Sequence, residues 1–180
     1  MSDVRWDILR RLLSTRRPGI ENLLSWMDTT DFYRAPASSK YHHAYPGGLA
    51  QHSLEVCNNL CNLHTQAIMT EHIVPYPLDS LYLVSLLHDL CKVNFYELTY
   101  NSKGKQVYVI KDSLPLGHGE KSLWLIERHV HLREAEALAI RWHMGDQPGM
   151  SYSDKQALSA ARAKEPLVNL LILADTSKLY

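Results

Sequence analysis

The sequence predicts an all-α fold, a single helical bundle with one small β-hairpin inserted in it. Apolar residues recur at helical spacing along most of the chain, as at Leu49, Val56 and Leu60. The period changes to two only over residues 94–111, where two short runs flank the turn cluster Asn101-Ser102-Lys103-Gly104. A chain of 180 residues is long enough to bury one core without disulfides or a second domain.

Glycine and proline bound the helices predicted in the first half of the chain. Two helices are expected over residues 3–14 and 20–27, on either side of Pro18-Gly19, with a loop over 36–39. Gly47-Gly48 opens a long helix from about residue 49 to 67, and Pro75 and Pro77 separate it from the next helix. This fourth helix is expected to carry His88-Asp89 at its C-terminal end.

The second half of the chain begins with the hairpin and continues as helices. The strands are expected over residues 94–100 and 106–111. Helices follow over about 118–131 and 134–144, and a C-terminal pair is broken at Pro166. The sequence contains no internal repeat or flexible linker, so one domain is expected over residues 1–180.

The composition is that of an ordinary soluble globular protein, with 46% hydrophobic and 21% charged residues. A formal net charge of zero argues against a broad nucleic-acid surface or a polybasic membrane face. The sequence has neither a secretory signal nor an apolar stretch of transmembrane length. Its three cysteines form no disulfide framework, and Cys57 and Cys61 are expected to be buried free thiols. A cytoplasmic protein without a membrane partner is therefore expected.

Ionisable side chains interrupt apolar helical stretches at four places. They are His52, the pair His88-Asp89, His143 and Asp175. Burying an unpaired ionised carboxylate is costly, so such groups normally pair with another charge or bind a metal. Imidazoles and carboxylates gathered from separate apolar helices therefore indicate a metal site.

These residues, with their local contexts, resemble the HD-domain metal-dependent phosphohydrolases. The order His52, His88-Asp89, Asp175 is similar to the H…HD…D signature of that family. Residues 45–54, YPGGLAQHSL, resemble the GGL-x-x-H-[ST]-L segment of the subgroup that contains bacterial HD-type 3′-to-5′ exoribonucleases, and residues 87–92 resemble its L-H-D-[IL]-x-K motif. The resemblance implies one HD domain, with N-terminal helices over residues 1–40 and a motif-bearing core over 41–180.

The same resemblance implies a site for one or two divalent ions. The ligands that it implies for a first ion are His52, His88, Asp89 and Asp175. His118 and His143 stand where dinuclear members carry two extra histidines that bind a second ion. In that arrangement Asp89 would bridge the two ions. Adjacent helix positions diverge by about 100°, so His88 and Asp89 can straddle two ions. Imidazole and carboxylate ligands together suit Mn, Fe, Co, Ni or Zn, with Mg as a further candidate. The resemblance also implies that Lys92 faces the substrate phosphate, so Asp89 and Lys92 are the expected catalytic residues.

The implied activity is hydrolysis of a nucleotide or another small phosphate ester by a metal-activated water, which needs no protein nucleophile. One alternative is a 3′-to-5′ exonuclease or phosphodiesterase on short single-stranded nucleic acid, and another is a non-catalytic HD-fold nucleotide sensor. The exoribonucleases carry an OB-type domain ahead of the HD module, whereas only about forty residues precede the motifs here. The neutral charge offers no electrostatic track either, so a small substrate is expected rather than long nucleic acid. A homo-oligomer stays open.

Several other side chains are weaker candidates, each with an equally plain role in packing or at the surface. Lys121 and Arg141 are further phosphate candidates, and His42 and His43 are candidates for lining the pocket. The aromatic residues that could stack on a base are Tyr41, Tyr45, Phe95, Tyr100 and Trp142.

Overall fold

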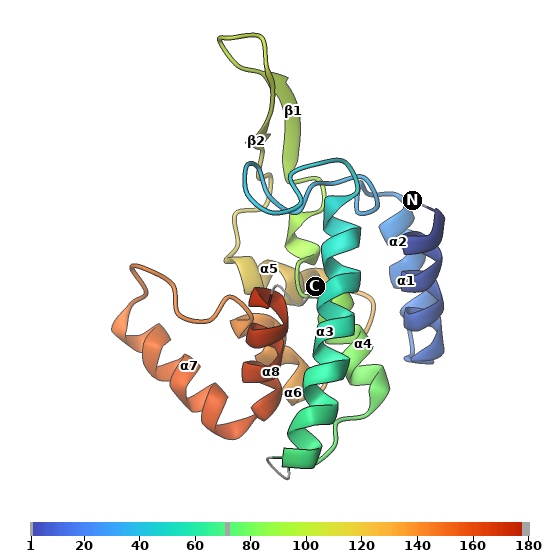
Figure 1. Cartoon of the computed structure of the whole chain (residues 1–180), viewed down its shortest axis with the longest axis vertical. Helices are drawn as coiled ribbons and strands as arrows, with labels where there is room; N and C mark the ends of the chain where they lie inside the picture. Colours follow the sequence, from blue (N-terminus) through green and yellow to red (C-terminus); the bar gives the residue numbers. More distant parts are fainter. Residues whose placement is uncertain (1, 71–72, 178–180) are drawn as a thin grey trace.

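The computed structural model describes residues 2–70 and 73–177. Within them lie eight α-helices, one short 3-10 turn and a two-stranded antiparallel sheet (Figure 1). The predicted all-α fold with a small inserted hairpin is therefore confirmed. No helix in these residues is both long enough and apolar enough to cross a bilayer.

The helices are grouped around α3 (Gly48–Thr70), which runs through the middle of the molecule in Figure 1. It packs against α4 (Leu78–Leu87), α8 (Pro166–Thr176) and α1 (Ser2–Ser14). Helix α2 (Ile20–Asp28) lies beside α1, while α6 (Glu134–Trp142) joins α5 (His118–Glu127) and α8. Helix α7 (Tyr152–Lys164) covers α8 from outside, and Pro166 begins α8 at its first turn, as the predicted break required.

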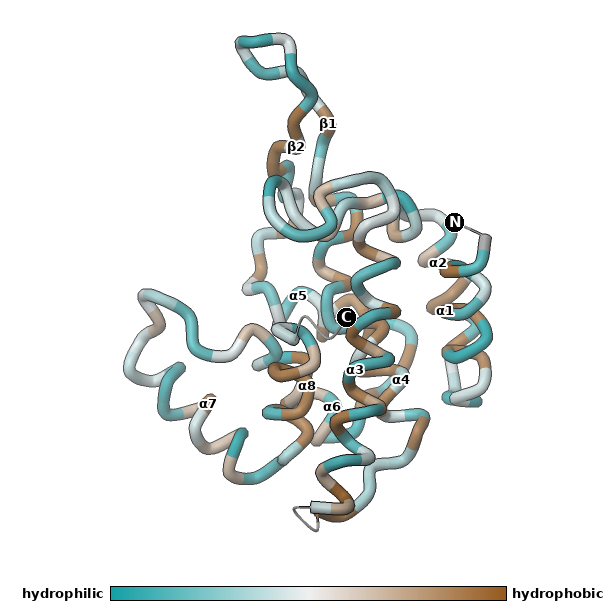
Figure 2. The backbone as a smooth tube through the Cα atoms, viewed as in Figure 1, coloured by the Kyte–Doolittle hydropathy of each residue, from teal (hydrophilic) through white to brown (hydrophobic). Residues whose placement is uncertain are grey.

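The core is built on α3 and α4, and α1, α2, α5, α6 and α8 add buried side chains to it. Leu83, Leu86 and Leu87 of α4 are fully buried, as are Leu49 and Leu60 of α3. Each buried side chain of this size stabilises the fold by about 1.5–3 kcal/mol relative to an exposed one. Figure 2 agrees with this burial, since α8 is coloured mainly hydrophobic and the tip of the hairpin hydrophilic. Apolar periodicity was therefore a sound guide to which helix faces turn inward.

The hairpin of β1 (Tyr96–Tyr100) and β2 (Gln106–Ile110) stands out from the helices in Figure 1. Tyr96 pairs with Ile110 and Tyr100 with Gln106 in the antiparallel register. At its base, Asn94 and Asp31 exchange hydrogen bonds: the Asn94 N–H donates to Asp31 Oδ1 at 2.6 Å, and the Asp31 N–H donates to Asn94 Oδ1 at 3.3 Å. The inserted hairpin is thus held against the loop that follows α2.

Four helix ends differ from the sequence prediction, the first being that of α3, which runs to Thr70 rather than ending near residue 67. Helix α4 ends at Leu87, so His88 is its C-cap, and Asp89 (φ −98°, ψ 18°) lies outside the helix before the 3-10 turn η1 (Leu90–Lys92). Helix α5 ends at Glu127 rather than near residue 131, because the Glu127 carboxylate accepts the Leu132 N–H and closes the chain into a turn. Helix α6 ends at Trp142 rather than near residue 144, because Gly145 (φ 62°) adopts the left-handed conformation that stops a helix.

A buried ion-pair network ties the α1–α2 linker to α4 and α6. Arg17 donates to both carboxylate oxygens of the fully buried Glu136, at 2.7 and 2.9 Å, and Ser80 donates to the same carboxylate at 2.6 Å. Asp79 pairs with Arg17 at 3.2 Å and with Arg133 at 3.0 Å. Burial would raise the pKa of Glu136, but the hydrogen bonds from Arg17 and Ser80 outweigh it and lower that pKa.

Candidate metal centre

The six residues expected to bind metal come together in one buried cluster. They are contributed by five segments: His52 by α3, His88 and Asp89 by the junction of α4 and η1, His118 by the first turn of α5, His143 by the residue after α6, and Asp175 by the end of α8. His52, His88, Asp89 and His143 are buried, while His118 and Asp175 are partly exposed. The segments meet because the apolar faces that carry these residues all point into the same core.

A close approach of α5 to α6 brings His118 near His143. Gly119 makes it possible, because a Cβ at this position would lie 2.2 Å from the carbonyl oxygen of Arg141. The ring centroids of His118 and His143 are 5.1 Å apart as a result. A side chain at residue 119 would push α5 away and separate the two imidazoles.

Asp89 is the centre of the cluster. Its Oδ1 lies 2.8 Å from Nε2 of His118 and 3.6 Å from Nε2 of His143. Its Oδ2 lies 3.5 Å from Nε2 of both His52 and His88. Each carboxylate oxygen therefore faces its own pair of imidazoles, which is the arrangement that a carboxylate bridging two cations needs. Because Asp89 has left the helix, this arrangement comes from the turn and not from the 100° helical divergence that the sequence suggested.

Asp175 completes the group on the side of His52 and His88. Its Oδ1 lies 2.9 Å from Nε2 of His52, without the angles of a hydrogen bond, and 3.6 Å from Nε2 of His88. Three sets of donor atoms lie within 4.8 Å of one another: His52, His88 and Asp89; His88, His143 and Asp175; and Asp89, His118 and His143. Each set could hold a metal ion.

In His88 and His143, Nδ1 lies against a backbone carbonyl, and Nε2 faces the other residues of the cluster. Nδ1 of His88 lies 2.8 Å from the carbonyl oxygen of Ser85, and Nδ1 of His143 lies 2.7 Å from that of Ile140. A carbonyl only accepts, so both Nδ1 atoms carry the proton. Nε2 of His88, His143 and His52 is buried without a hydrogen-bond partner in the described part of the chain. An unsatisfied buried polar atom costs about 1–3 kcal/mol. A metal ion would satisfy all three, and metal-binding histidines commonly donate their other N–H to a carbonyl.

The buried charges shift the pKa values of the cluster. Burial would lower the pKa of His88, but Asp89 and Asp175 outweigh it and raise that pKa to about 10. Asp89 raises the pKa of His118 to about 10, again against the effect of burial. Burial would raise the carboxyl pKa of Asp89, yet Lys92 and His88 hold it well below its usual range. The carboxylates therefore stay ionised, and they hold protons on His88 and His118 that a metal cation would displace.

Lys92 lies at the edge of the cluster, in η1. Its Nζ donates to Oδ2 of Asp89 at 2.6 Å, and its side chain is 12% exposed. The side chains of His118 and Asp175 are 32% and 16% exposed. Solvent therefore reaches the cluster at these three side chains. The ring of His42 is also close, with its centroid 5.3 Å from that of His52.

The other two phosphate candidates are engaged elsewhere. Lys121 is buried, donates to Asp112 at 2.6 Å and lies 5.0 Å from the centroid of the Phe95 ring, so it fixes the base of the hairpin to α5. Arg141 pairs with Glu120 at 2.5 Å, which links α6 to α5.

The sequence interpretation missed Cys91. Its Sγ lies 3.3 Å from Nδ1 of His118, and the residue is 3% exposed. Its position between Asp89 and Lys92 in the motif was the available signal. Cys57 and Cys61 lie on α3 away from the cluster, with Cys57 buried and Cys61 half-buried.

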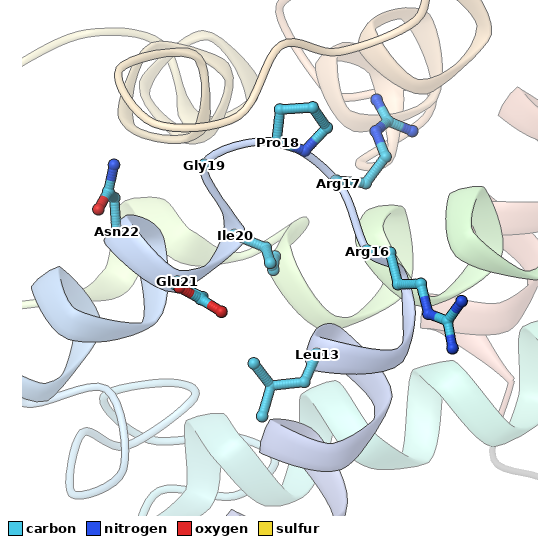
Figure 3. A pocket seen from close by; sticks show the side chains of 8 residues that line it. All are labelled: Leu13, Arg16, Arg17, Pro18, Gly19, Ile20, Glu21 and Asn22. Atoms are coloured by element: carbon cyan, nitrogen blue, oxygen red, sulfur yellow. The ribbon is translucent and has the colours of Figure 1, made fainter.

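A hollow of about 400 Å³ lies elsewhere, at the α1–α2 linker (Figure 3). Its lining residues all fall between Leu13 and Asn22, and they include no histidine or cysteine. In Figure 3 the side chains of Arg16 and Arg17 point in different directions, and Arg17 belongs to the buried network with Glu136. This hollow therefore offers no catalytic set of its own.

A comparison of the chain with protein-family models, curated proteins and solved structures found no match. The donor atoms around Asp89 are accordingly the basis of the functional argument.

Proposed function

We propose that this chain is a metal-dependent phosphohydrolase that acts on a nucleotide or another small phosphate ester, as its resemblance to the HD-domain enzymes implies. The observation that carries the proposal is the cluster of four imidazoles and two carboxylates from five segments. Three of its buried Nε2 atoms lack a hydrogen-bond partner in the described residues. If the cluster were only a set of structural ion pairs, these three Nε2 atoms would be expected to have hydrogen-bond partners. Instead they belong to sets of donor atoms that lie within 4.8 Å of one another.

The chain's own residues divide into two ligand groups in this proposal. His52, His88, Asp89 and Asp175 would hold one ion, and Asp89, His118 and His143 would hold a second. Manganese, iron, cobalt, nickel or zinc would suit these donors, and magnesium is a further candidate. Bound ions would supply Lewis acidity and an activated water for attack on phosphorus.

Lys92 would bind the substrate phosphate at the exposed edge. Its ammonium already contacts Asp89, so a phosphate held there would meet a fixed positive charge beside the ligand groups. A charge-assisted hydrogen bond of this kind is about twice as strong as a neutral one. His88 and His143 are both fully buried, so bulk water does not reach the cluster at these two residues.

The hairpin favours a second candidate, a 3′-to-5′ exonuclease or phosphodiesterase on short single-stranded nucleic acid. The register puts Tyr96, Tyr100 and Tyr108 on one face, with Tyr100 67% exposed. Lys103 and Lys105 are exposed at the tip. Aromatic rings that stack on bases, combined with cations that attract phosphates, are the usual means of binding single strands.

A hydrolysis panel on metal-loaded protein tests the proposal. The substrates are nucleoside mono-, di- and triphosphates, dinucleoside polyphosphates, cyclic dinucleotides and short oligonucleotides. We expect small nucleotides to be cleaved by the wild type but not by Asp89→Asn, because an amide lacks the negative charge of a bridging carboxylate. Asp146→Asn, which removes an exposed carboxylate paired with Arg162, is the matched control and should stay active.

Other outcomes of the same panel would decide against this function. Faster degradation of oligonucleotides from the 3′ end than of any small nucleotide would favour the second candidate. Replacing residues 98–108 with a short Gly-Ser turn should then abolish oligonucleotide cleavage and leave metal content unchanged. Tight nucleotide binding without hydrolysis of any substrate would identify a sensor.

A further inference from the structure

His118 differs from His88 and His143, its two neighbours in the cluster, in the partner of its Nδ1. Nδ1 of His88 and of His143 is held by a backbone carbonyl. The His118 ring has a side-chain partner instead, Sγ of Cys91, which lies 3.3 Å from Nδ1 and 3.5 Å from Nε2. The Nε2 of His118 lies 2.8 Å from Oδ1 of Asp89, so the ring is held at both nitrogens.

Cys91 is itself fixed to the helix that carries His118. The Cys91 N–H donates at 3.0 Å to Oγ of Ser122, a fully buried residue of α5. Ser122 follows His118 by four residues, which is about one helical turn. Two hydrogen bonds one turn apart therefore join η1 to α5, and they place the sulfur beside the His118 ring.

We propose that Cys91 is a positioning residue for the second ion of the metal centre. Its sulfur accepts the Nδ1–H of His118 and so directs Nε2 toward Asp89. The inference rests on the proposed metal centre. The sulfur is not itself a ligand, because none of the three sets of converging donor atoms in the described residues includes Cys91.

His118 needs such a partner more than the other histidines do. Its side chain is 32% exposed, whereas those of His88 and His143 are fully buried and fixed by packing. Without an acceptor at Nδ1, the His118 ring would be free to turn, and its Nε2 would spend less time facing Asp89. Loss of such an outer partner typically weakens metal affinity by about 10–100-fold.

Metal titration of three variants tests this role. In Cys91→Ala the affinity for the second ion should fall by about 10–100-fold, while the first ion binds as in the wild type. Cys91→Ser keeps an acceptor and should recover part of that loss, and Cys61→Ala, which changes a thiol on α3, should match the wild type. Equal weakening of both ions, or unchanged affinity in Cys91→Ala, would overturn the proposal. Cobalt-loaded wild type should lack the strong near-ultraviolet sulfur-to-metal absorption, and such a band lost in Cys91→Ala would make Cys91 a ligand instead.

A second measurement does not depend on metal. In nitrogen-15 NMR spectra of the metal-free protein, the Nδ1–H of His118 should exchange slowly with water, because it is hydrogen-bonded to sulfur. The signal should vanish through fast exchange in Cys91→Ala and persist in Cys61→Ala. If the wild type binds no metal, the metal centre is refuted, and this measurement still decides whether Cys91 holds His118. Unchanged exchange in Cys91→Ala would show that it does not.

Discussion

The roles of Asp89 and Lys92 can be separated although the two side chains touch. Asp89 faces four imidazoles with its two oxygens, so in the proposed metal centre its charge would serve the ions, whereas the Lys92 ammonium forms its ion pair with Asp89 at the edge of the cluster. A substitution at Lys92 therefore removes a phosphate contact without removing a ligand.

We expect Lys92→Ala to lower kcat/KM for a small phosphate ester by roughly 10–100-fold, from the loss of one hydrogen bond to a charged group worth about 1.5–3 kcal/mol. Metal content should not change. Steady-state kinetics and metal analysis on the same preparation check both statements, with Lys155→Ala on the exposed surface of α7 as the control. A loss of metal together with activity would mean that Lys92 supports the ligands rather than the substrate.

Single residues could be predicted from the sequence where their surroundings were unusual. An imidazole or carboxylate within an apolar stretch identified His52, His143 and Asp175, because burial without a partner is costly. The roles of Lys121 and Cys91 could not be predicted, since their partners are distant in sequence or lie on another helix. Only the packing of α5 against η1 and the hairpin base brings these partners into contact.

At the scale of elements, a network of hydrogen bonds around Glu136 links segments that are distant in sequence. It joins the α1–α2 linker, the start of α4 and the start of α6 through one buried carboxylate. No local sequence pattern predicts this network, because Arg17 and Glu136 are 119 positions apart.

Glu136→Gln should lower the free energy of unfolding by about 3 kcal/mol, since it leaves the Arg17 guanidinium buried beside a neutral amide. Urea denaturation measures this change. The matched control is Glu134→Gln on the same helix, which breaks an exposed ion pair with Lys164 and should cost less than about 1 kcal/mol. Equal effects of the two substitutions would show that the network contributes no more than a surface pair.

The same carboxylate predicts a pH dependence. The folded-state pKa of Glu136 is lowered from its ordinary value of 4.5, so its contribution to stability is present above that pH and is lost as the pH falls through the folded-state value. We expect the free energy of unfolding of the wild type to decline below about pH 4.5 more steeply than that of Glu136→Gln. Chemical denaturation between pH 3 and 7 checks the difference; parallel curves would contradict it.

The boundaries of an element could be predicted from the sequence only where neighbouring residues in the chain determine the turn. The hairpin strands lie within two residues of their predicted limits, because the cluster at residues 101–104 determines the turn. The ends of α5 and α4 were misplaced, because a side-chain cap by Glu127 and the departure of Asp89 from the helix depend on neighbouring elements.

For the molecule as a whole, the fold class followed from apolar periodicity, which reports burial directly. The convergence of the six candidate ligands did not follow from periodicity alone: it was inferred from ionisable residues within apolar stretches and from the resemblance to the HD-domain enzymes. Periodicity shows which face of a helix is buried. It does not show which buried residues of different helices lie next to one another. The distances around Asp89 supply that information.

Metal should therefore stabilise the entire fold and not only the site. Five segments supply the donor atoms, so unfolding any of them would break the centre. A metal ion at a hundredfold excess over its dissociation constant adds about 2.7 kcal/mol, which for a chain of this length raises the melting temperature by about 5–10 °C. Thermal unfolding with saturating manganese or nickel, against the same protein in chelator, measures the shift. Asp89→Asn should remain folded and show little of it, whereas Asp146→Asn should show all of it. Identical melting curves of the wild type in metal and in chelator would refute a buried metal centre, because a cation that binds only the folded state must stabilise it.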